Sequence, residues 1–268
     1  MKIAALQTDI VWESPDENFR RLRPRLDAAR QAGAQLLVLP EMFACGFSMN
    51  TDGIAETMDG PTLTYLRQEA TRLGCWICGS LPLREPPAAS KPANAFCFAG
   101  PDGQLHRYDK IHPFSYAGEH ERYTAGRAAI SITLEGVRIT PFVCYDLRFA
   151  DLFWSKATAT DCYVVVANWP TKRSHHWAAL LRARAIENQA WVVGVNRVGD
   201  GGGLSYDGKS AIIDPQGNEI VRASHDETCL IADVTAARVE ETRARFPFLQ
   251  DRVRPSQDDA RDDRKISK

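Results

Sequence analysis

The chain has 268 residues, 44% of them hydrophobic, and its 33 basic and 34 acidic residues leave a formal net charge of −1 at pH 7. Such a balance provides no basic field to attract nucleic acid or anionic lipid, so we expect neither as a partner. The amino-terminal apolar run is too brief for a signal peptide, and no stretch has the roughly 20 apolar residues of a membrane-spanning helix. We therefore expect a cytoplasmic protein.

The first part of the chain alternates between strand and helix patterns. An apolar strand over residues 3–6 precedes a helix that begins near Pro15, with acidic residues in its first turn. A buried strand is predicted over 36–39, followed by a helix over 61–73 with glycine directly after it. The run from Cys75 to Cys78 begins the next strand.

Two turn signals add antiparallel hairpins to this alternation, one at residues 100–103 and one at 214–217. The other elements expected after residue 90 are strands over 94–99, 104–108 and 137–143, a helix from about Phe149, a strand over 163–167, a helix over 174–189 and a strand over 191–195. Strands that alternate with helices, with hairpins at the edges, predict mixed sheets. We predict an α/β fold in which two stacked mixed sheets are covered by helices, a four-layer α-β-β-α sandwich.

Residues 1–254 show no long linker and no repeat, so we expect one domain there. Residues 255–268 are too polar to join a core, and we expect a mobile tail. The segment 239–253 is apolar enough either to cover a partner subunit or to fold back on its own domain.

Seven cysteines lie scattered along the chain, an odd number that argues against a disulfide framework. Cys75 and Cys78 have the spacing of a redox or zinc half-site, but residues three apart on a strand point to opposite faces. No His-Glu-x-x-His run or second close cysteine pair supports a metal site. We therefore expect no metal and no redox pair.

Three residues with useful chemistry each follow a short apolar run: Glu41, Lys110 and Cys144. A cysteine where a strand passes into a helix has an exposed sulfur, and the backbone N–H groups that follow can lower the pKa of its thiol and bind an oxyanion. A nearby carboxylate can take the thiol proton, and a lysine can stabilise the developing negative charge. Each residue alone has a simpler explanation, as a buried cysteine, a surface turn acid or a solvated lysine.

Together, the segments 39–41, 108–112 and 143–149 resemble the three signature blocks of the carbon-nitrogen hydrolase (nitrilase) superfamily. Their order, and the separations of 69 and 34 residues between Glu41, Lys110 and Cys144, suit that family. The resemblance extends through 168–170 and 182–189 and covers roughly residues 1–245.

The resemblance implies Cys144 as the nucleophile, Glu41 as general base and acid, and Lys110 as the oxyanion stabiliser, helped by the backbone N–H of Tyr145. It implies no metal and no organic cofactor. Members also carry a second glutamate after the lysine block, which positions substrate or water. Glu119 and Glu121 both fit that position; we prefer Glu119 and leave Glu121 open.

Within the superfamily the chain is most similar to the ω-amidase branch, judged by segments 144–149, 168–170 and 194–199. The resemblance implies a short dicarboxylate monoamide as substrate, such as 2-oxoglutaramate or 2-oxosuccinamate. The distal carboxylate of such a substrate requires a cation or N–H donors. Our hypothesis is that Lys172 or Arg173 binds it, although two solvated loop cations would explain the pair equally well. We also expect two aromatic residues, Tyr116 and Phe43, to shape the pocket.

Two alternatives stay open at this point. A nitrile or N-carbamoyl amino acid hydrolase would use the same three residues, because they determine the chemistry better than the substrate. A non-catalytic binding protein would keep the fold, although intact Glu41, Lys110 and Cys144 argue against it. Proteins resembling this one usually assemble as dimers, so we expect a homodimer that acts on a small amide.

Overall fold

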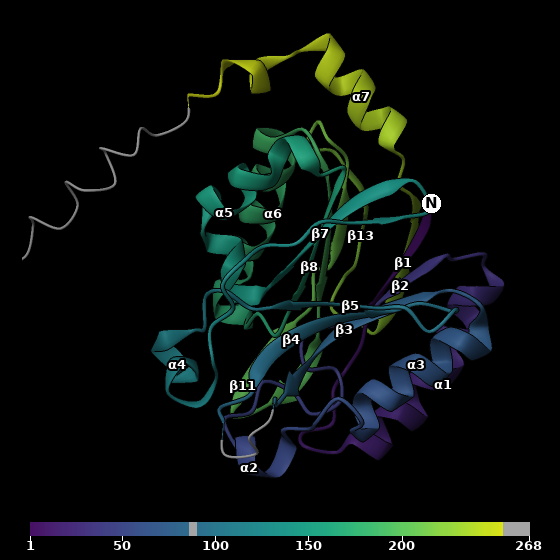
Figure 1. Ribbon diagram of the computed structural model, residues 1–268, viewed down its shortest axis with the longest axis vertical. Helices are drawn as coiled ribbons and strands as arrows, with labels where there is room; N and C mark the ends of the chain where they lie inside the picture. The colour runs from purple at the N-terminus through teal and green to yellow at the C-terminus, as the bar shows by residue number, and fades with distance from the viewer. Residues whose placement is uncertain (86–89, 254–268) are drawn as a thin grey trace, which may run out of the picture.

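Two six-stranded sheets stack face to face in the middle of the molecule (Figure 1). The computed structural model describes residues 1–85 and 90–253, so the tail predicted over 255–268 lies outside the described residues. The first sheet contains, in spatial order, β14 (Thr228–Asp233), β1 (Lys2–Gln7), β2 (Leu36–Val38), β3 (Trp76–Leu83), β4 (Ala93–Ala99) and β5 (Leu105–Asp109). The second contains β13 (Glu219–Arg222), β12 (Ala211–Ile213), β9 (Trp191–Asn196), β8 (Cys162–Ala167), β7 (Val137–Val143) and β6 (Ile132–Leu134).

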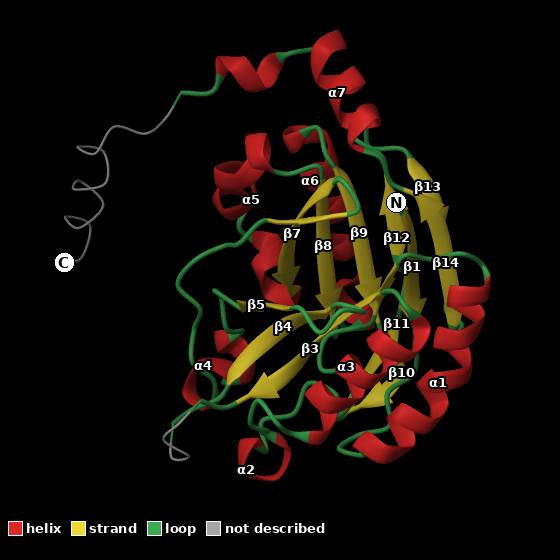
Figure 2. Ribbon diagram, turned by 45° about the vertical axis from the view of Figure 1, so that its right-hand side comes forward, coloured by secondary structure: helices red, strands yellow, loops and turns green. Residues whose placement is uncertain are grey.

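Both sheets are mixed, as the sequence predicts. Strands β1, β2 and β3 are parallel, and so are β7, β8 and β9, while the strands that flank them pair antiparallel. The predicted hairpin turns at 100–103 and 214–217 join β4 to β5 and β12 to β13. In Figure 2 the arrows of β7, β8 and β9 point toward the same end of the molecule.

Helices cover the outer faces of both sheets (Figures 1 and 2). α1 (Pro15–Gln31) and α3 (Pro61–Leu73) lie on the first sheet, whereas α5 (Ala150–Lys156) and α6 (Ser174–Asn188) lie on the second. A proline in the first turn starts both α1 and α3, and α3 ends at Gly74, whose φ of 62° suits a residue without a Cβ. The predicted four-layer α-β-β-α sandwich is confirmed.

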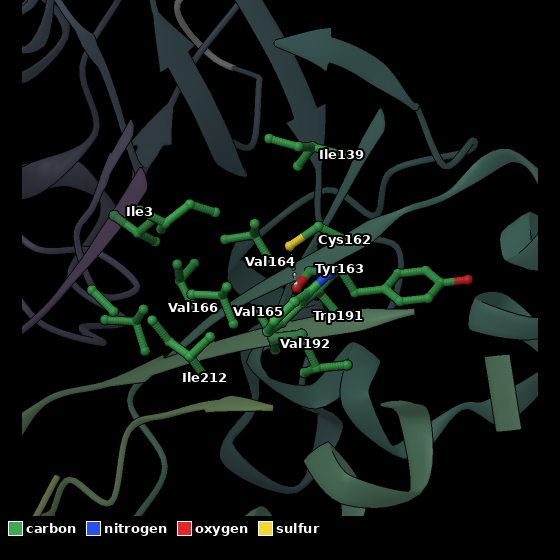
Figure 3. Close-up of a cluster of buried hydrophobic side chains, with 14 of the residues drawn as sticks. Ile3, Ile139, Cys162, Tyr163, Val164, Val165, Val166, Trp191, Val192 and Ile212 are labelled. Atoms are coloured by element: carbon green, nitrogen blue, oxygen red, sulfur yellow. Dashed lines mark hydrogen bonds between the residues drawn. The ribbon is translucent and has the colours of Figure 1, made fainter. Parts of the chain in front are cut away.

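The space between the sheets is filled by apolar side chains from both of them. Figure 3 shows Ile3 of the first sheet with Val164, Val166 and Ile212 of the second, all fully buried. Their burial excludes water from the centre of the molecule and stabilises the stacked sheets. The two sheets are therefore held together as a rigid support for the residues at the ends of their strands.

The two cysteines with half-site spacing, Cys75 and Cys78, point to opposite faces of the first sheet. Cys78 packs in the core between the sheets, and Cys75 packs beneath α1 and α3. The expected separation is confirmed.

The glycine-rich segment 199–203 belongs to a hairpin that the sequence did not reveal, formed by β10 (Val198–Gly201) and β11 (Leu204–Asp207). The remaining helices are α2 (Thr51–Ile54), α4 (Glu119–Arg122) and α7 (Ala236–Arg245), with 3-10 turns over Ser115–Ala117, Cys144–Arg148, Ala157–Ala159, Thr171–Arg173 and Phe248–Asp251. Within 239–253, Val239 and Leu249 are buried while Phe246 is 65% exposed. Among the described helices, none has the length and apolarity needed to cross a membrane.

Candidate active site

Glu41, Lys110 and Cys144, which the sequence singled out, come together at one end of the stacked sheets. Glu41 follows β2, Lys110 directly follows β5, and Cys144 directly follows β7. The Nζ of Lys110 lies 3.1 Å from Oε1 of Glu41, and the charges of both groups act on the Cys144 thiol. Side chains beyond the carboxyl ends of parallel strands can converge in this way because the strands end at the same edge.

Glu41 is fully buried and held by three donors. Its Oε1 accepts from Lys110 Nζ at 3.1 Å and from Asn94 Nδ2 at 2.8 Å, and its Oε2 accepts from the backbone N–H of Asn168 at 2.8 Å. The side-chain amide of Asn168 also donates to the backbone carbonyl of Glu41 at 2.6 Å. The carboxylate therefore has one fixed orientation, as a general base requires.

Lys110 is shared between Glu41 and a second buried carboxylate, Glu119. The Nζ of Lys110 donates to both oxygens of Glu119, at 3.0 and 2.8 Å, and the backbone N–H of Phe114 donates to Oε2. Glu119 has no exposed surface, whereas the side chain of Glu121 is 72% exposed. The structure thus places Glu119, and not Glu121, in the cluster with Lys110.

The charges in this cluster oppose the effect of burial. Burial alone would lower the pKa of Lys110, but the carboxylates of Glu119 and Glu41 outweigh it and raise that pKa above its ordinary value. Burial raises the pKa of Glu119, Lys110 opposes this shift, and Glu41 adds to it. Lys110 therefore stays protonated and can supply fixed positive charge.

Cys144 directly follows β7 and is the first residue of the 3-10 turn Cys144–Arg148. Its φ is 46°. A non-glycine residue at positive φ is strained, and such strain is held where the surroundings fix the backbone. Burial raises the pKa of the Cys144 thiol well above its usual range; Glu41 adds to the rise, and Lys110 opposes it. The pKa is therefore raised rather than lowered as the position after a strand suggests, and the resting sulfur is a thiol that would need a base to become a nucleophile.

Asp146 links this turn to residues 108–112, the segment that contains Lys110. Its carboxylate, which is fully buried, accepts from the Tyr108 hydroxyl at 2.8 Å, from the His112 backbone N–H at 2.9 Å and from the Val143 backbone N–H at 3.1 Å, and it lies 3.0 Å from Nδ1 of His112. One side chain thereby fixes the positions of the segments that carry Lys110 and Cys144.

Replacing Asp146 by alanine is expected to lower the free energy of unfolding by about 3 kcal/mol, because several buried donors lose their acceptor. Urea denaturation at pH 7 measures this loss. Asp151→Ala, on the exposed side of α5, is the matched control and should leave the midpoint nearly unchanged. Equal midpoints for the two variants would contradict the role of Asp146.

Cys144 opens into a cavity of about 230 Å³ with mostly apolar walls. The described residues that line it are Phe47, Met49, Phe114, Ala117, Cys144, Tyr145, Arg148, Asn168, Trp169, Pro170, Arg173, Gly202, Leu204 and Tyr206. The hairpin β10–β11 supplies the last three of them. Such a volume admits only a small substrate, and the two arginines give one part of the wall a positive charge.

The predicted pocket residues divide between the cavity and other places. Tyr145 and Arg173 line the cavity, whereas Lys172 is exposed and lies outside the wall. Two predictions were wrong: Tyr116 is 88% exposed, and Phe43 packs in the core under α1 and α3. Tyr116 follows the loop into a surface turn, and Phe43 points toward the helix layer because the chain turns sharply after Glu41.

Sequence reasoning missed Asn94, Arg148 and Tyr206 as parts of the site. Asn94 is the second residue of β4 and could have been found only from the pairing of β4 with β5, which places it beside Lys110. Arg148 lies four residues after Cys144, a spacing that was visible but to which we gave no role. Tyr206 comes from the unpredicted hairpin.

Known proteins resemble this chain over nearly its whole length. The carbon-nitrogen hydrolase family model matches residues 2–244. The chain is 41% identical to the omega-amidase YafV of Escherichia coli (strain K12) over 254 residues, which are 94% of this chain and 96% of that protein. It is 31% identical to the 2-oxoglutaramate amidase of Bacillus subtilis (strain 168) over 253 residues, 93% of this chain and 96% of that one.

A solved structure agrees with this relationship. XC1258 from Xanthomonas campestris, described as a CN-hydrolase superfamily protein with an arsenic adduct in its active site, superposes with a TM-score of 0.89 at 39% sequence identity. The match covers 96% of this chain and 98% of that one. The chain therefore belongs to the carbon-nitrogen hydrolase (nitrilase) superfamily, as an amidase that hydrolyses carbon-nitrogen bonds other than peptide bonds.

Proposed function

We propose that the protein is an ω-amidase, which releases ammonia from a short dicarboxylate monoamide such as 2-oxoglutaramate or 2-oxosuccinamate. The observation that carries this proposal is that Cys144 and two guanidinium groups, of Arg148 and Arg173, line the same small cavity. A nucleophile and a carboxylate-binding pair at one cavity suit a short substrate with an amide at one end and an acid at the other. The names of the Escherichia coli and Bacillus subtilis relatives support the same substrate class.

In the first half-reaction, Glu41 takes the proton of the Cys144 thiol as the sulfur bonds to the amide carbon. The carbonyl oxygen becomes an oxyanion, which Lys110 and the backbone N–H of Tyr145 stabilise. Glu41 then gives its proton to the amide nitrogen, the carbon-nitrogen bond breaks, and ammonia leaves. A thioester between the acyl group and Cys144 remains.

In the second half-reaction, a water molecule replaces ammonia beside Glu41. Glu41 accepts a proton from this water as its oxygen attacks the thioester carbon, and Lys110 again faces the oxyanion. The carbon-sulfur bond breaks, the acid product forms, and the proton held by Glu41 returns to the sulfur. Glu119 keeps Lys110 in place through both half-reactions by its two hydrogen bonds to Nζ.

Aromatic rings hold both arginines of the cavity wall. The guanidinium of Arg148 lies 4.7 Å from the ring centroid of Trp169 and donates to Nδ1 of His176 at 3.3 Å. Burial and the neighbouring cations keep the pKa of His176 below its usual value, so its neutral ring can accept this bond at pH 7. The guanidinium of Arg173 lies 5.5 Å from the ring centroid of Phe114. Preorganised guanidinium groups bind a carboxylate strongly because they offer paired N–H donors.

Arg148→Met and Arg173→Met are each expected to raise the Michaelis constant for 2-oxoglutaramate by about 10- to 100-fold. The reason is that each variant loses one charge-assisted hydrogen bond to the distal carboxylate of the substrate. Steady-state ammonia release measures the effect. Both variants should hydrolyse a neutral amide of the same length at the same rate as the wild type does. Lys172→Met is the matched control, because Lys172 is an exposed neighbour outside the wall. An unchanged Michaelis constant in both arginine variants would remove them from the substrate site.

The substrate class itself is tested by comparing 2-oxoglutaramate, 2-oxosuccinamate, an N-carbamoyl amino acid and a simple nitrile in one ammonia-release assay. We expect kcat/KM to be highest for the two oxo-acid amides. A higher value for the carbamoyl compound or the nitrile would overturn the proposal and leave the same catalytic residues serving a different substrate.

A further inference from the structure

Asn94 lies between the two buried glutamates of the site. It is 1% exposed, and its Nδ2 donates to Oε1 of Glu41 at 2.8 Å and to Oε1 of Glu119 at 3.1 Å. Its backbone carbonyl accepts from the backbone N–H of Lys110 at 3.0 Å. A single residue of β4 thus connects both carboxylates and the segment that carries the lysine.

The acceptor sites of the two carboxylates can be counted against their donors. An ionised carboxylate has about four lone-pair sites, two on each oxygen. Glu119 accepts four hydrogen bonds: two from Lys110, one from Asn94 and one from the Phe114 N–H. No site is left on Glu119 for a proton from the substrate or from water.

Glu41 retains one acceptor site. Lys110 and Asn94 occupy both sites of its Oε1, while its Oε2 accepts one bond, from the Asn168 N–H, among the described residues. The charge of Glu41 acts on the Cys144 thiol, and Oε2 is the oxygen of Glu41 that has a free acceptor site for the thiol proton.

We propose that Asn94 is a positioning residue that directs the thiol proton to Oε2 of Glu41 by occupying Oε1. As the S–H bond of Cys144 breaks, the proton bonds to Oε2, and the same oxygen later delivers it to the amide nitrogen. Replacing Asn94 by a residue without a donor removes a hydrogen bond of the kind that favours the ionised form of a carboxylate. This inference rests on the catalytic roles in the proposed function.

The amide side chain suits this position better than a charged one would. An aspartate would place a third carboxylate beside two others, and a lysine would add a second cation that weakens the base. Leucine has a similar volume but no donor, so Glu41 would lose one hydrogen bond that stabilises the ionised form of a carboxylate.

Several other titratable groups also affect how Glu41 responds to pH. The titratable groups whose charge interacts with Glu41 are Lys110, Glu119, Cys144, Cys45, Tyr123 and Tyr206.

The test is the pH dependence of two rates in Asn94→Leu and in the isosteric Asn94→Asp. The first rate is kcat/KM for 2-oxoglutaramate; the second is alkylation of Cys144 by iodoacetamide, followed by the mass of the peptide that contains Cys144. We expect the acid limb of both profiles to move to higher pH, by about one unit in Asn94→Leu and further in Asn94→Asp. We also expect kcat to fall about 10- to 100-fold. The Michaelis constant should change little, because Asn94 is not part of the cavity wall.

Asn188→Leu is the matched control. Asn188 is fully buried and donates to the Arg184 carbonyl at 2.9 Å on α6, so its loss removes a buried amide without touching the carboxylates. It should lower stability and leave both acid limbs in place. If Asn94→Leu fails to fold, the pH profiles of Asn94→Asp test the inference, since aspartate keeps the shape of the asparagine side chain.

An unmoved acid limb in the folded Asn94 variants would overturn the inference. The alkylation rate separates this failure from that of the proposed function, because it needs no substrate. A wild-type protein that does not hydrolyse 2-oxoglutaramate, with an alkylation limb that still moves in the variants, would refute the substrate and support the role of Asn94.

Discussion

Replacing Cys144 by alanine is expected to abolish amide hydrolysis, with a fall in kcat on the order of 10⁵-fold, as when the nucleophile of other acyl-transfer enzymes is removed. Cys144 carries the one thiol among the described residues that line the cavity. Without its sulfur no thioester can form, and Glu41 and Lys110 alone supply no nucleophile that could replace the covalent intermediate. Ammonia release from 2-oxoglutaramate measures the loss.

The matched control is Cys229→Ala, at an exposed cysteine on β14, which should keep wild-type activity. Rapid-quench mass spectrometry of the wild type should detect an acyl group on the peptide that contains Cys144, and Cys144→Ala should lack it. Full hydrolysis by Cys144→Ala would refute the catalytic assignment altogether.

Replacing Lys110 by methionine is expected to have the second largest effect, a fall in kcat of about 10³-fold or more. Loss of one oxyanion donor accounts for about 10²- to 10³-fold. A further loss follows from the charge left behind, since Glu41 and Glu119 would be buried together without a cation. Burial and mutual repulsion favour protonated carboxyl groups, so in this variant Glu41 should be a weaker base at pH 7 for the role proposed above.

The same change should make stability depend on pH in a defined direction. Removing one partner of a buried ion pair costs about 3 to 5 kcal/mol. Carboxyl groups whose pKa is raised in the folded state bind protons more readily than in the unfolded state, so their stabilisation is present at low pH and lost as pH rises. Lys110→Met should therefore have a higher urea midpoint at pH 5 than at pH 7.

The double variant Lys110→Met/Glu119→Gln separates catalysis from folding. Neutralising Glu119 removes the repulsion and should restore part of the stability at pH 7, whereas kcat should stay low because the oxyanion still lacks its cation. Recovery of activity together with stability would show that Lys110 acts only as a structural counter-ion.

Much of the fold could be predicted because it follows from local patterns. The helix that begins at Pro15 has a proline and acids in its first turn, and the hairpin at 100–103 has turn residues between two predicted strands. The hairpin over 198–207 was missed because four glycines interrupt it, and glycine weakens any strand pattern. The strands β10 and β11 are stabilised by tertiary packing, which cannot be predicted from the periodicity of the sequence.

The sequence by itself determined the three residues at the strand ends, since Glu41 and Cys144 follow apolar strands, Lys110 follows the second strand of a predicted hairpin, and their order is typical of one superfamily. Only the tertiary structure decided between Glu119 and Glu121, which are two residues apart on one short helical turn yet respectively buried and exposed. It alone placed Asn94 between the carboxylates. The physical reason is that hydrogen bonds and cavity walls form between segments distant in the chain, and their direction depends on how the sheets and loops pack.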